Sequence, residues 1–318
     1  MADRTRPHLM AAYGGGSWSP RTQSLSEELG QLWAACGSNS EYGKLKSVLM
    51  HRPGTELTRS SDPDAVQMIE PLDLKRAQQQ HDSIANAYRR NDVTVHYVDP
   101  AGEPTPNQMF AADLMVATPE GVILARPAST VRAGEERNVA RRLADLGVPI
   151  VRSIGGNGTF EGADAMWLTP KHLILGRGLR TNDAAVRQII SLMDHMGVEV
   201  TVVDLPFGTM HLMGMLRIAD RDLAIAWPTR LAHRGVEALK REGYQVVFLP
   251  DLEEAINCSA FNFVTLGPRE ILTAADTPRT TAFYEDLGIF VHLVHTDELG
   301  KAAGNIGCLT GVLHRESV

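Results

Sequence analysis

Short apolar runs alternate with amphipathic helical patterns along almost the whole chain of 318 residues. In the helical segments, apolar residues recur at intervals of three and four. Such alternation with short links favours an α/β domain with a parallel or mixed sheet. The predicted strands are 45–51, 93–98, 114–125, 148–152, 165–175, 200–204, 213–226, 246–249, 261–266 and 289–293, and the predicted helices are 73–90, 133–146, 181–196, 229–242 and 278–287.

Glycines mark the ends of several of these helices. Gly147, Gly197, Gly243 and Gly288 follow helical patterns where a left-handed C-cap is needed. One helix and two or three strands recur in roughly every 60 residues, which is compatible with a repeated supersecondary unit. We find no repeat at the level of individual residues. The pattern alone therefore does not choose among topologies.

Composition narrows the class of partner. A hydrophobic fraction of 43% and a charged fraction of 22% are those of an ordinary soluble globular protein, which disfavours membrane and disordered classes. The net charge is −7, and no block of basic residues is present. Nucleic-acid binding requires clustered Lys and Arg for phosphate contacts. We therefore expect a small-molecule partner, with no nucleic acid and no membrane.

The cysteines and the N-terminus indicate the compartment. Cys36, Cys258 and Cys308 form neither a CxxC motif nor a metal-ligand spacing, so neither a disulfide framework nor a metal site is predicted. The first 20 residues are polar and lack the apolar core of a signal peptide. A cytoplasmic protein fits these features best.

One cysteine stands in a setting that suggests chemistry. Cys308 lies in the sequence GNIGCLTGVL, where small residues surround the thiol. The usual fate of a lone cysteine is that of a small buried hydrophobe. Upstream lie His211 in MHLM, Glu161 and Asp164 in FEGAD, and Asp113 at the end of PNQMFAAD. A thiol, an imidazole and carboxylates are the groups that nucleophilic attack with proton transfer requires.

Together with the HRPG stretch at 51–54, these motifs resemble the guanidino-group-modifying superfamily of arginine deiminase, dimethylargininase, arginine dihydrolase and the amidinotransferases. The resemblance runs from about residue 41 to the end of the chain. It implies a five-bladed pseudo-symmetric α/β propeller, the pentein fold, with its site in the central channel. We accordingly expect a flexible arm at residues 1–30 and a single pentein catalytic domain at 31–318.

The resemblance implies a role for each member of the motif set. Cys308 corresponds to the nucleophile of the family's GGxxCM-type C-terminus, and His211 matches its HLxx motif. His211 would protonate the leaving nitrogen and then activate water, although a histidine before an apolar strand is more often a core residue. The segment 161–164 resembles EGGD with Ala163 in place of the second glycine. Glu161 would then be the acid partner of His211, and Asp164 would be structural.

Substrate contacts follow from two further similarities. Asn107 and Asp113 resemble the asparagine and carboxylate of a PNxxFxRD motif, in which the carboxylate holds the guanidinium. Ala112 stands where arginine is usual, so we expect a supporting ion pair to be missing. Arg132 and Arg180 resemble the positions that bind the substrate α-carboxylate through paired N–H groups. A surface arginine at a helix start is the alternative for both.

Met213 is the departure with the most bearing on the substrate. If His211 lies on a strand facing the substrate, alternation places Met213 on the same face. Deiminases and amidinotransferases have an aspartate there that contacts the guanidinium. A methionine would instead form an apolar wall that tolerates an N-alkyl group.

These observations predict a cofactor-independent, cysteine-dependent hydrolase of linear amidines. It would cleave a C–N bond of arginine or an N-substituted arginine through a covalent thiouronium-type intermediate. An amidinotransferase with the same intermediate is one alternative, and a catalytically silent pentein that binds a ligand is another. The sequence leaves homo-oligomerisation open.

Overall fold

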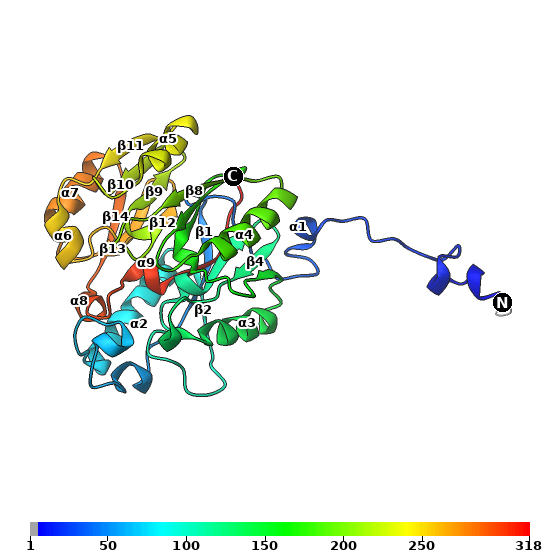
Figure 1. Ribbon diagram of the computed structural model, residues 1–318, viewed down its shortest axis with the longest axis horizontal. Coiled ribbons are helices and arrows are strands. Elements are labelled where there is room, and N and C mark those ends of the chain that lie inside the picture. Colours follow the sequence, from blue (N-terminus) through cyan, green and yellow to red (C-terminus); the bar gives the residue numbers. More distant parts are fainter. Residues whose placement is uncertain (1–5) are drawn as a thin grey trace.

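The computed structural model describes residues 6–318, and this part of the chain contains five three-stranded sheets. In each sheet the first and second strands are antiparallel, whereas the second and third are parallel and are joined through a helix. A parallel pair requires such a crossover, which places the helix on a face of the sheet. Figure 1 shows α3, α5 and α7 at the outside of the body. The predicted pentein architecture is confirmed.

The repeated unit is therefore strand, strand, helix, strand. In four of the five sheets the unit follows the order of the chain. Two of these units are β3 (Met115–Thr118), β4 (Gly121–Leu124), α3 (Glu135–Asp145) and β5 (Ile150–Ser153), and then β6 (Ala165–Thr169), β7 (His172–Arg177), α4 (Asp183–His195) and β8 (Glu199–Asp204). The other two are β9 (Leu216–Asp220), β10 (Leu223–Ala226), α5 (His233–Arg241) and β11 (Gln245–Phe248), and then β12 (Val264–Gly267), β13 (Glu270–Ala274), α7 (Pro278–Asp286) and β14 (Phe290–Val294).

The remaining sheet joins the two ends of the folded body. Strand β15 (Gly311–Arg315) pairs antiparallel with β1 (Leu45–Met50), and β1 pairs parallel with β2 (Thr94–Tyr97) across α2 (Leu74–Arg90). The last strand of the chain thus completes the first sheet. Strand β15 also contacts β3 of the next sheet, and β1 contacts β12, so the ring of sheets is closed.

The first strand of each sheet (β15, β3, β6, β9 and β12) is the inner strand, and the third is the outer strand. The inner strands are more deeply buried than the outer ones. All four residues of β3 and of β12 are buried, whereas the third strands β5 and β11 expose both of their ends. A strand covered on both faces has no polar side, which explains why the inner strands read as continuous apolar runs rather than as alternating ones.

Short helical turns stand immediately before four of the inner strands. They are η5 (Ala111–Leu114), η7 (Gly162–Asp164), η8 (Leu212–Gly214) and α9 (Ile306–Leu309). Turn η7 contacts both η5 and η8, and α9 contacts η5. Because each inner strand starts at the same end of the ring, these turns converge there. The other short elements are η3 (Thr55–Thr58), η4 (Asp64–Val66), η6 (Thr130–Arg132), α6 (Leu252–Asn257) and α8 (Asp297–Gly300).

The predicted elements are present with small shifts in their bounds. All five predicted helices form, and the four glycines that follow them have positive φ angles, as predicted. The predicted strands 114–125, 165–175 and 213–226 are each a hairpin of two strands, and the first and last of these ranges begin inside a helical turn. Strands β13 and β15 were not predicted.

The N-terminal segment leaves the body of the protein. Figure 1 shows residues 6–24, with η1 (Pro7–Leu9) and η2 (Ala11–Tyr13), extending away from the sheets. Helix α1 (Leu25–Glu28) lies at the junction, and the side chain of Leu29 packs against buried residues of the body. The flexibility of an arm at residues 1–30 stays a prediction, and residues 1–5 lie outside the described part. Within residues 6–318, no helix is long and apolar enough to cross a membrane.

Gly162 allows turns η5 and η7 to approach. A Cβ atom there would lie 2.3 Å from the Met115 carbonyl oxygen and 2.4 Å from that of Ala112. Both neighbours are backbone atoms, so they cannot rotate away. The position therefore requires glycine because of the close approach.

We expect Gly162→Ala to lower the free energy of unfolding by about 1–3 kcal/mol, the usual cost of overpacking. Gly155→Ala is the matched control, because a Cβ atom there meets no atom within 4 Å. Urea unfolding would measure both variants. Equal unfolding midpoints for the two variants would show that the turns can separate without cost.

Candidate active site

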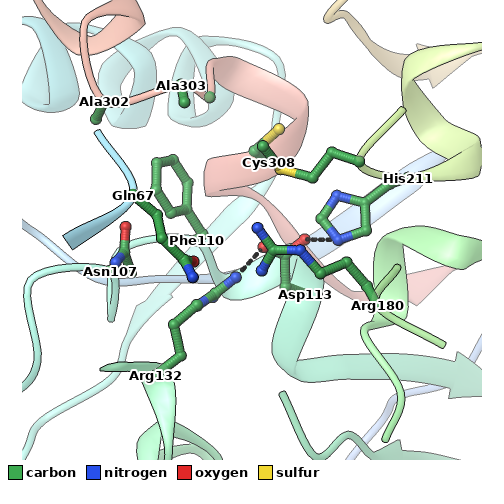
Figure 2. Close-up of a pocket in the computed structure, with 12 residues that line it drawn as sticks. Gln67, Asn107, Phe110, Asp113, Arg132, Arg180, His211, Ala302, Ala303 and Cys308 are labelled. Atoms are coloured by element: carbon green, nitrogen blue, oxygen red, sulfur yellow. Dashed lines mark hydrogen bonds and ion pairs between the residues drawn. The ribbon is translucent and has the colours of Figure 1, made fainter. Parts of the chain in front are cut away.

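The converging turns border a pocket whose empty space is about 300 Å³. Figure 2 shows Cys308 on α9 above Asp113, with His211 and Arg180 on one side and Arg132 on the other. The five residues come from four of the five repeated units. The pocket is lined by Gln67, Asn107, Phe110, Asp113, Arg132, Arg180, Met210, His211, Ala302, Ala303, Gly304 and Cys308.

The imidazole of His211 forms a buried ion pair with the carboxylate of Glu161. His211 donates from Nε2 to Glu161 Oε2 at 2.7 Å, and Glu161 is fully buried beneath the pocket. Burial alone would lower the pKa of His211, but the carboxylates of Asp113, Glu161 and Asp164 outweigh it and raise this pKa to about 9. Against the opposing effect of burial, the same hydrogen bond holds the pKa of Glu161 well below its usual range. The imidazole is therefore held as a cation near neutral pH.

Asp113 has one engaged and one open oxygen. Arg132 donates from Nη1 to Asp113 Oδ2 at 2.6 Å. Asp113 Oδ1 is buried without a hydrogen-bond partner among the described residues, and it lies 3.8 Å from His211 Nε2. The expected lack of a supporting ion pair next to Ala112 is thus wrong, because Arg132 supplies one from another turn. The open oxygen is an acceptor for a cationic group in the pocket.

The two arginines line the pocket, but they also belong to the buried ionic network. Arg132 pairs with Asp113, with Glu135 at 2.8 Å and with Glu161 at 3.4 Å. Arg180 donates from Nη1 to Glu161 at 3.1 Å, and its Nε has no hydrogen-bond partner among the described residues. Neither is a surface arginine, because they are 3% and 6% exposed.

Asp164 joins two of the turns. Thr181 Oγ1 donates to its Oδ2 at 2.6 Å, and the backbone N–H of Leu212 donates to its Oδ1 at 3.0 Å. Burial raises the pKa of Asp164 to about 6, against the effect of nearby His211. Because Leu212 follows His211 directly, this bond fixes the backbone that carries the imidazole.

Asn107 lines the pocket and ties its rim. Its Nδ2 donates to the Val66 carbonyl oxygen at 2.7 Å. Gln67, which follows Val66 in the chain, also lines the pocket and has a positive φ of 63°. Sequence reasoning missed Gln67, because the segment between β1 and α2 shows no periodic pattern.

Met213 does not line this pocket. Residue 211 is the N-cap of a 3-10 helix rather than part of a strand, so alternation does not hold between residues 211 and 213. Met213 lies instead at a second cavity with Glu41 and Trp167. The expectation that Met213 shares a face with His211 is wrong, and Met210 is the methionine at the pocket.

The sulfur of Cys308 has a side-chain partner that sequence reasoning also missed. Asn262 donates from Nδ2 to Cys308 Sγ at 3.1 Å. Burial and the charge of Asp113 raise the pKa of Cys308, whereas the hydrogen bond from Asn262 lowers it. Asn262 stands two residues before the inner strand β12, and Asp113, Glu161, His211 and Cys308 likewise stand two to five residues before inner strands. This shared position in the repeat is the signal that identifies it.

Three pocket groups have the geometry of metal ligands. Atoms of Asp113, Glu161 and His211 lie within 4.8 Å of one another. However, Arg132 and Arg180 contact these carboxylates with buried positive charge. That charge opposes a further cation at the same oxygens. The prediction of a metal-free and cofactor-free site stays a prediction.

We expect Glu161→Gln to lower the pKa of His211 by about 1–3 units, because an opposite charge in contact is removed. Since the wild-type pKa is raised, the stability that this pair contributes is full below the ordinary histidine pKa and is lost as pH rises through about 9. NMR titration of the imidazole would measure the shift. Glu237→Gln, at an exposed carboxylate, is the control, and an unchanged midpoint in Glu161→Gln would contradict the assignment.

Comparison with known proteins gives a consistent result. The family model described as "N,N dimethylarginine dimethylhydrolase, eukaryotic" matches residues 65–279. The N(G),N(G)-dimethylarginine dimethylaminohydrolase of Streptomyces coelicolor is 28% identical over 265 residues, which cover 83% of this chain and 96% of that protein. The enzyme of that name from Pseudomonas aeruginosa is 26% identical over 239 residues, which cover 75% and 89%.

Solved structures share the fold. The structure of the Pseudomonas aeruginosa protein with citrulline has a TM-score of 0.71 at 23% identity, and the match covers 86% of this chain and 100% of that one. The N-terminal domain of ArgZ, an arginine dihydrolase from cyanobacteria, has a TM-score of 0.73 at 19% identity, covering 86% and 98%. Since the family model spans more than half of the sequence, the chain belongs to the dimethylarginine dimethylhydrolase family, within the guanidino-group-modifying pentein superfamily.

Proposed function

We propose that this protein is a cysteine-dependent hydrolase that cleaves a C–N bond of arginine or an N-substituted arginine. The observation that carries the proposal is the open carboxylate oxygen of Asp113, in a pocket shared with Cys308 and His211. A buried acceptor without a partner is costly. A guanidinium offers the N–H donors that this oxygen lacks, together with a positive charge that suits a carboxylate. Membership of the family supports a guanidino substrate.

Cys308 is the proposed nucleophile. A guanidinium carbon is a weak electrophile because three nitrogens share its charge, so a covalent route is favoured over direct attack by water. Attack of the thiolate forms the S–C bond, and loss of the amine breaks the C–N bond. Water then hydrolyses the thiouronium-type intermediate and releases the thiolate.

His211 is the proposed proton carrier. Its raised pKa keeps it protonated, so it can give its proton to the leaving amine. The resulting neutral imidazole can then take a proton from the attacking water. Glu161 holds the ring through a bond of 2.7 Å and favours its charged form, so it acts through His211 rather than on the substrate.

The bound substrate would itself promote formation of the thiolate. Burial and Asp113 raise the pKa of Cys308 in the empty pocket. A guanidinium held by Asp113 offsets that carboxylate's charge and adds a cation beside the sulfur. The Cys308 thiol then loses its proton to solvent mainly when substrate is present, which generates the nucleophile.

The far end of the substrate is proposed to meet the arginines. Arg180 has an Nε–H without a partner among the described residues, and both Arg132 and Arg180 line the pocket. Guanidinium groups bind carboxylates through paired N–H donors. An α-carboxylate therefore fits this side, with Asn107 nearby at the rim.

We expect Cys308→Ser to abolish turnover, because a hydroxyl is a far weaker nucleophile than a thiolate at neutral pH. Cys258→Ser is the matched control, since Cys258 lies outside the pocket. Activity would be followed by release of ammonia or alkylamine. Retention of more than about a tenth of the activity would overturn the assignment, because removal of a covalent nucleophile typically costs about a million-fold.

The reaction type is tested with arginine, monomethylarginine and asymmetric dimethylarginine, with product masses measured in the presence and absence of added primary amines. Hydrolysis predicts citrulline and an amine, unchanged by the additive. Citrulline as the final product would show one round of hydrolysis, and ornithine would show two. Transfer of the amidino group to the added amine would instead identify an amidinotransferase, and lack of any turnover would identify a ligand-binding protein.

Met210 is proposed to form the apolar wall beside the reacting group. We expect Met210→Ala to lower the ratio of kcat/KM for methylated over unmethylated arginine by about tenfold, the worth of a methyl contact in an apolar pocket. Met213→Ala is the control, because Met213 lies at another cavity and should leave the ratio unchanged. A change in the ratio for Met213→Ala alone would contradict this placement.

A further inference from the structure

A buried polar pair stands behind the proposed nucleophile. Asn262 donates from Nδ2 to Cys308 Sγ at 3.1 Å, and Arg217 of β9 donates from Nη2 to Asn262 Oδ1 at 3.2 Å. The two residues come from neighbouring sheets of the ring. Together they form a chain of donors that runs from the guanidinium to the sulfur.

Arg217 fixes the orientation of the amide. Its second bond, from Nε to the Phe261 carbonyl oxygen at 3.1 Å, anchors the guanidinium beside the backbone that carries Asn262. Because a guanidinium offers only donors, it selects the oxygen end of the Asn262 amide. A flipped amide would direct N–H groups at the guanidinium and an oxygen at the sulfur. The amide N–H groups therefore face Cys308.

Among the described residues, Arg217 forms no ion pair with a carboxylate, and Glu41 acts on its charge only from beyond ion-pair distance. Arg217 is 6% exposed, and the ion pairs found within residues 6–318 include none with it. Arginine is rarely buried without an anion, since desolvation of the charge must be offset. The nearest group that can become an anion along its hydrogen bonds is the Cys308 thiol, through Asn262. Burial lowers the pKa of Arg217 to about 10, and Cys308 is the leading influence that opposes this.

Gly307 allows the pair to approach the nucleophile. A Cβ atom at this position would lie 2.5 Å from Asn262 Oδ1 and 2.6 Å from Arg217 Nη2. The φ angle of Gly307 is not in the left-handed region, so its backbone conformation does not require glycine. Close contact with the pair is what excludes a side chain there.

We infer that Asn262, oriented by Arg217, holds the Cys308 sulfur in place for attack and stabilises its thiolate. The inference rests on the proposed function, in which Cys308 is the nucleophile. Asn262 contacts the reacting sulfur, whereas Arg217 is a positioning residue that acts through it. The amide oxygen is engaged by Arg217, so Asn262 does not take the thiol proton. Its N–H groups lower the free energy of the Cys308 thiolate that remains after the proton leaves.

The test is the pH dependence of alkylation of Cys308 by iodoacetamide, read by peptide mass. This neutral probe reports the thiolate without requiring turnover. Asn262→Asp keeps the shape of the side chain and can still pair with Arg217, but it replaces the N–H donors with a carboxylate. We expect the apparent pKa of Cys308 to rise by one unit or more, which is tenfold less thiolate at a fixed pH below it.

Controls separate this role from a structural one. Asn257→Asp makes the same change at an exposed asparagine and should leave the titration unchanged. Because the new carboxylate also repels the thiolate, Asn262→Leu is measured beside it, since leucine removes the donors without adding a charge. The inference predicts a raised pKa of Cys308 in Asn262→Leu as well, whereas a role in packing alone predicts that Asn262→Leu alters the melting temperature but not this titration. Where turnover is measured, we expect kcat to fall with little change in KM, since Asn262 contacts the sulfur rather than the substrate.

The outcomes distinguish the inference from the proposed function. An unchanged or lowered pKa of Cys308 in Asn262→Asp, with Cys308→Ser inactive, would overturn the inference and leave the function standing. A raised pKa with Cys308→Ser still active would overturn the function, and the inference, which needs Cys308 as nucleophile, would fall with it. Should Asn262→Asp fail to fold, Arg217→Lys provides the same readout, because lysine keeps the charge but cannot hold both the amide and the Phe261 carbonyl.

Discussion

The antiparallel pairing of β15 with β1 is the constraint on which the site depends. It joins the last strand of the chain to the first and closes the ring of sheets. Cys308 stands three residues before β15, so the register of this pair sets the position of the thiol. Thr310 strengthens the link, since its hydroxyl bonds to Tyr88 Oη of α2 and to the Ile306 carbonyl oxygen, each at 2.7 Å. The proposed nucleophile is therefore placed by contacts between the two ends of the folded chain.

The interactions that hold the centre of the ring are the same ones that set its chemistry. Arg132 joins carboxylates from two turns, Asp113 and Glu161, and Glu161 in turn holds His211. Removing one member would leave a buried charge unpaired, which is strongly destabilising. The network also raises the pKa of His211 and leaves one oxygen of Asp113 open. Stability and the proposed proton transfer thus share one set of contacts.

The sequence predicts what local pattern and motif control. Helix 73–90 is visible because its apolar face follows the helical period, and α2 forms there. The sequence predicts 114–125 and 213–226 as single strands, although Pro119-Glu120 and Arg221-Asp222 interrupt their apolar residues at the hairpin turns. Such strands are buried on both faces, so alternation gives no boundary.

The candidate site could be predicted from the sequence only in part. Motif resemblance named Cys308, His211 and Asp113, which the structure brings together at one pocket. The HRPG stretch, by contrast, builds the turn after β1, where the Gly54 N–H donates to Glu56 at 2.6 Å. The pairings of Arg132 with Asp113 and of Asn262 with Cys308 join residues far apart in the sequence, so no local motif shows which residues pair. They depend on how the five sheets meet.

In the proposed reaction, Cys308 becomes covalently attached to the substrate carbon during turnover. The most direct measurement is peptide mass analysis after acid quenching of the wild-type protein with saturating substrate, over times that span one turnover. We expect a transient adduct on the peptide containing Cys308, with Cys36 and Cys258 unmodified. Product formation with Cys308 unmodified throughout, or an adduct on either other cysteine, would contradict it.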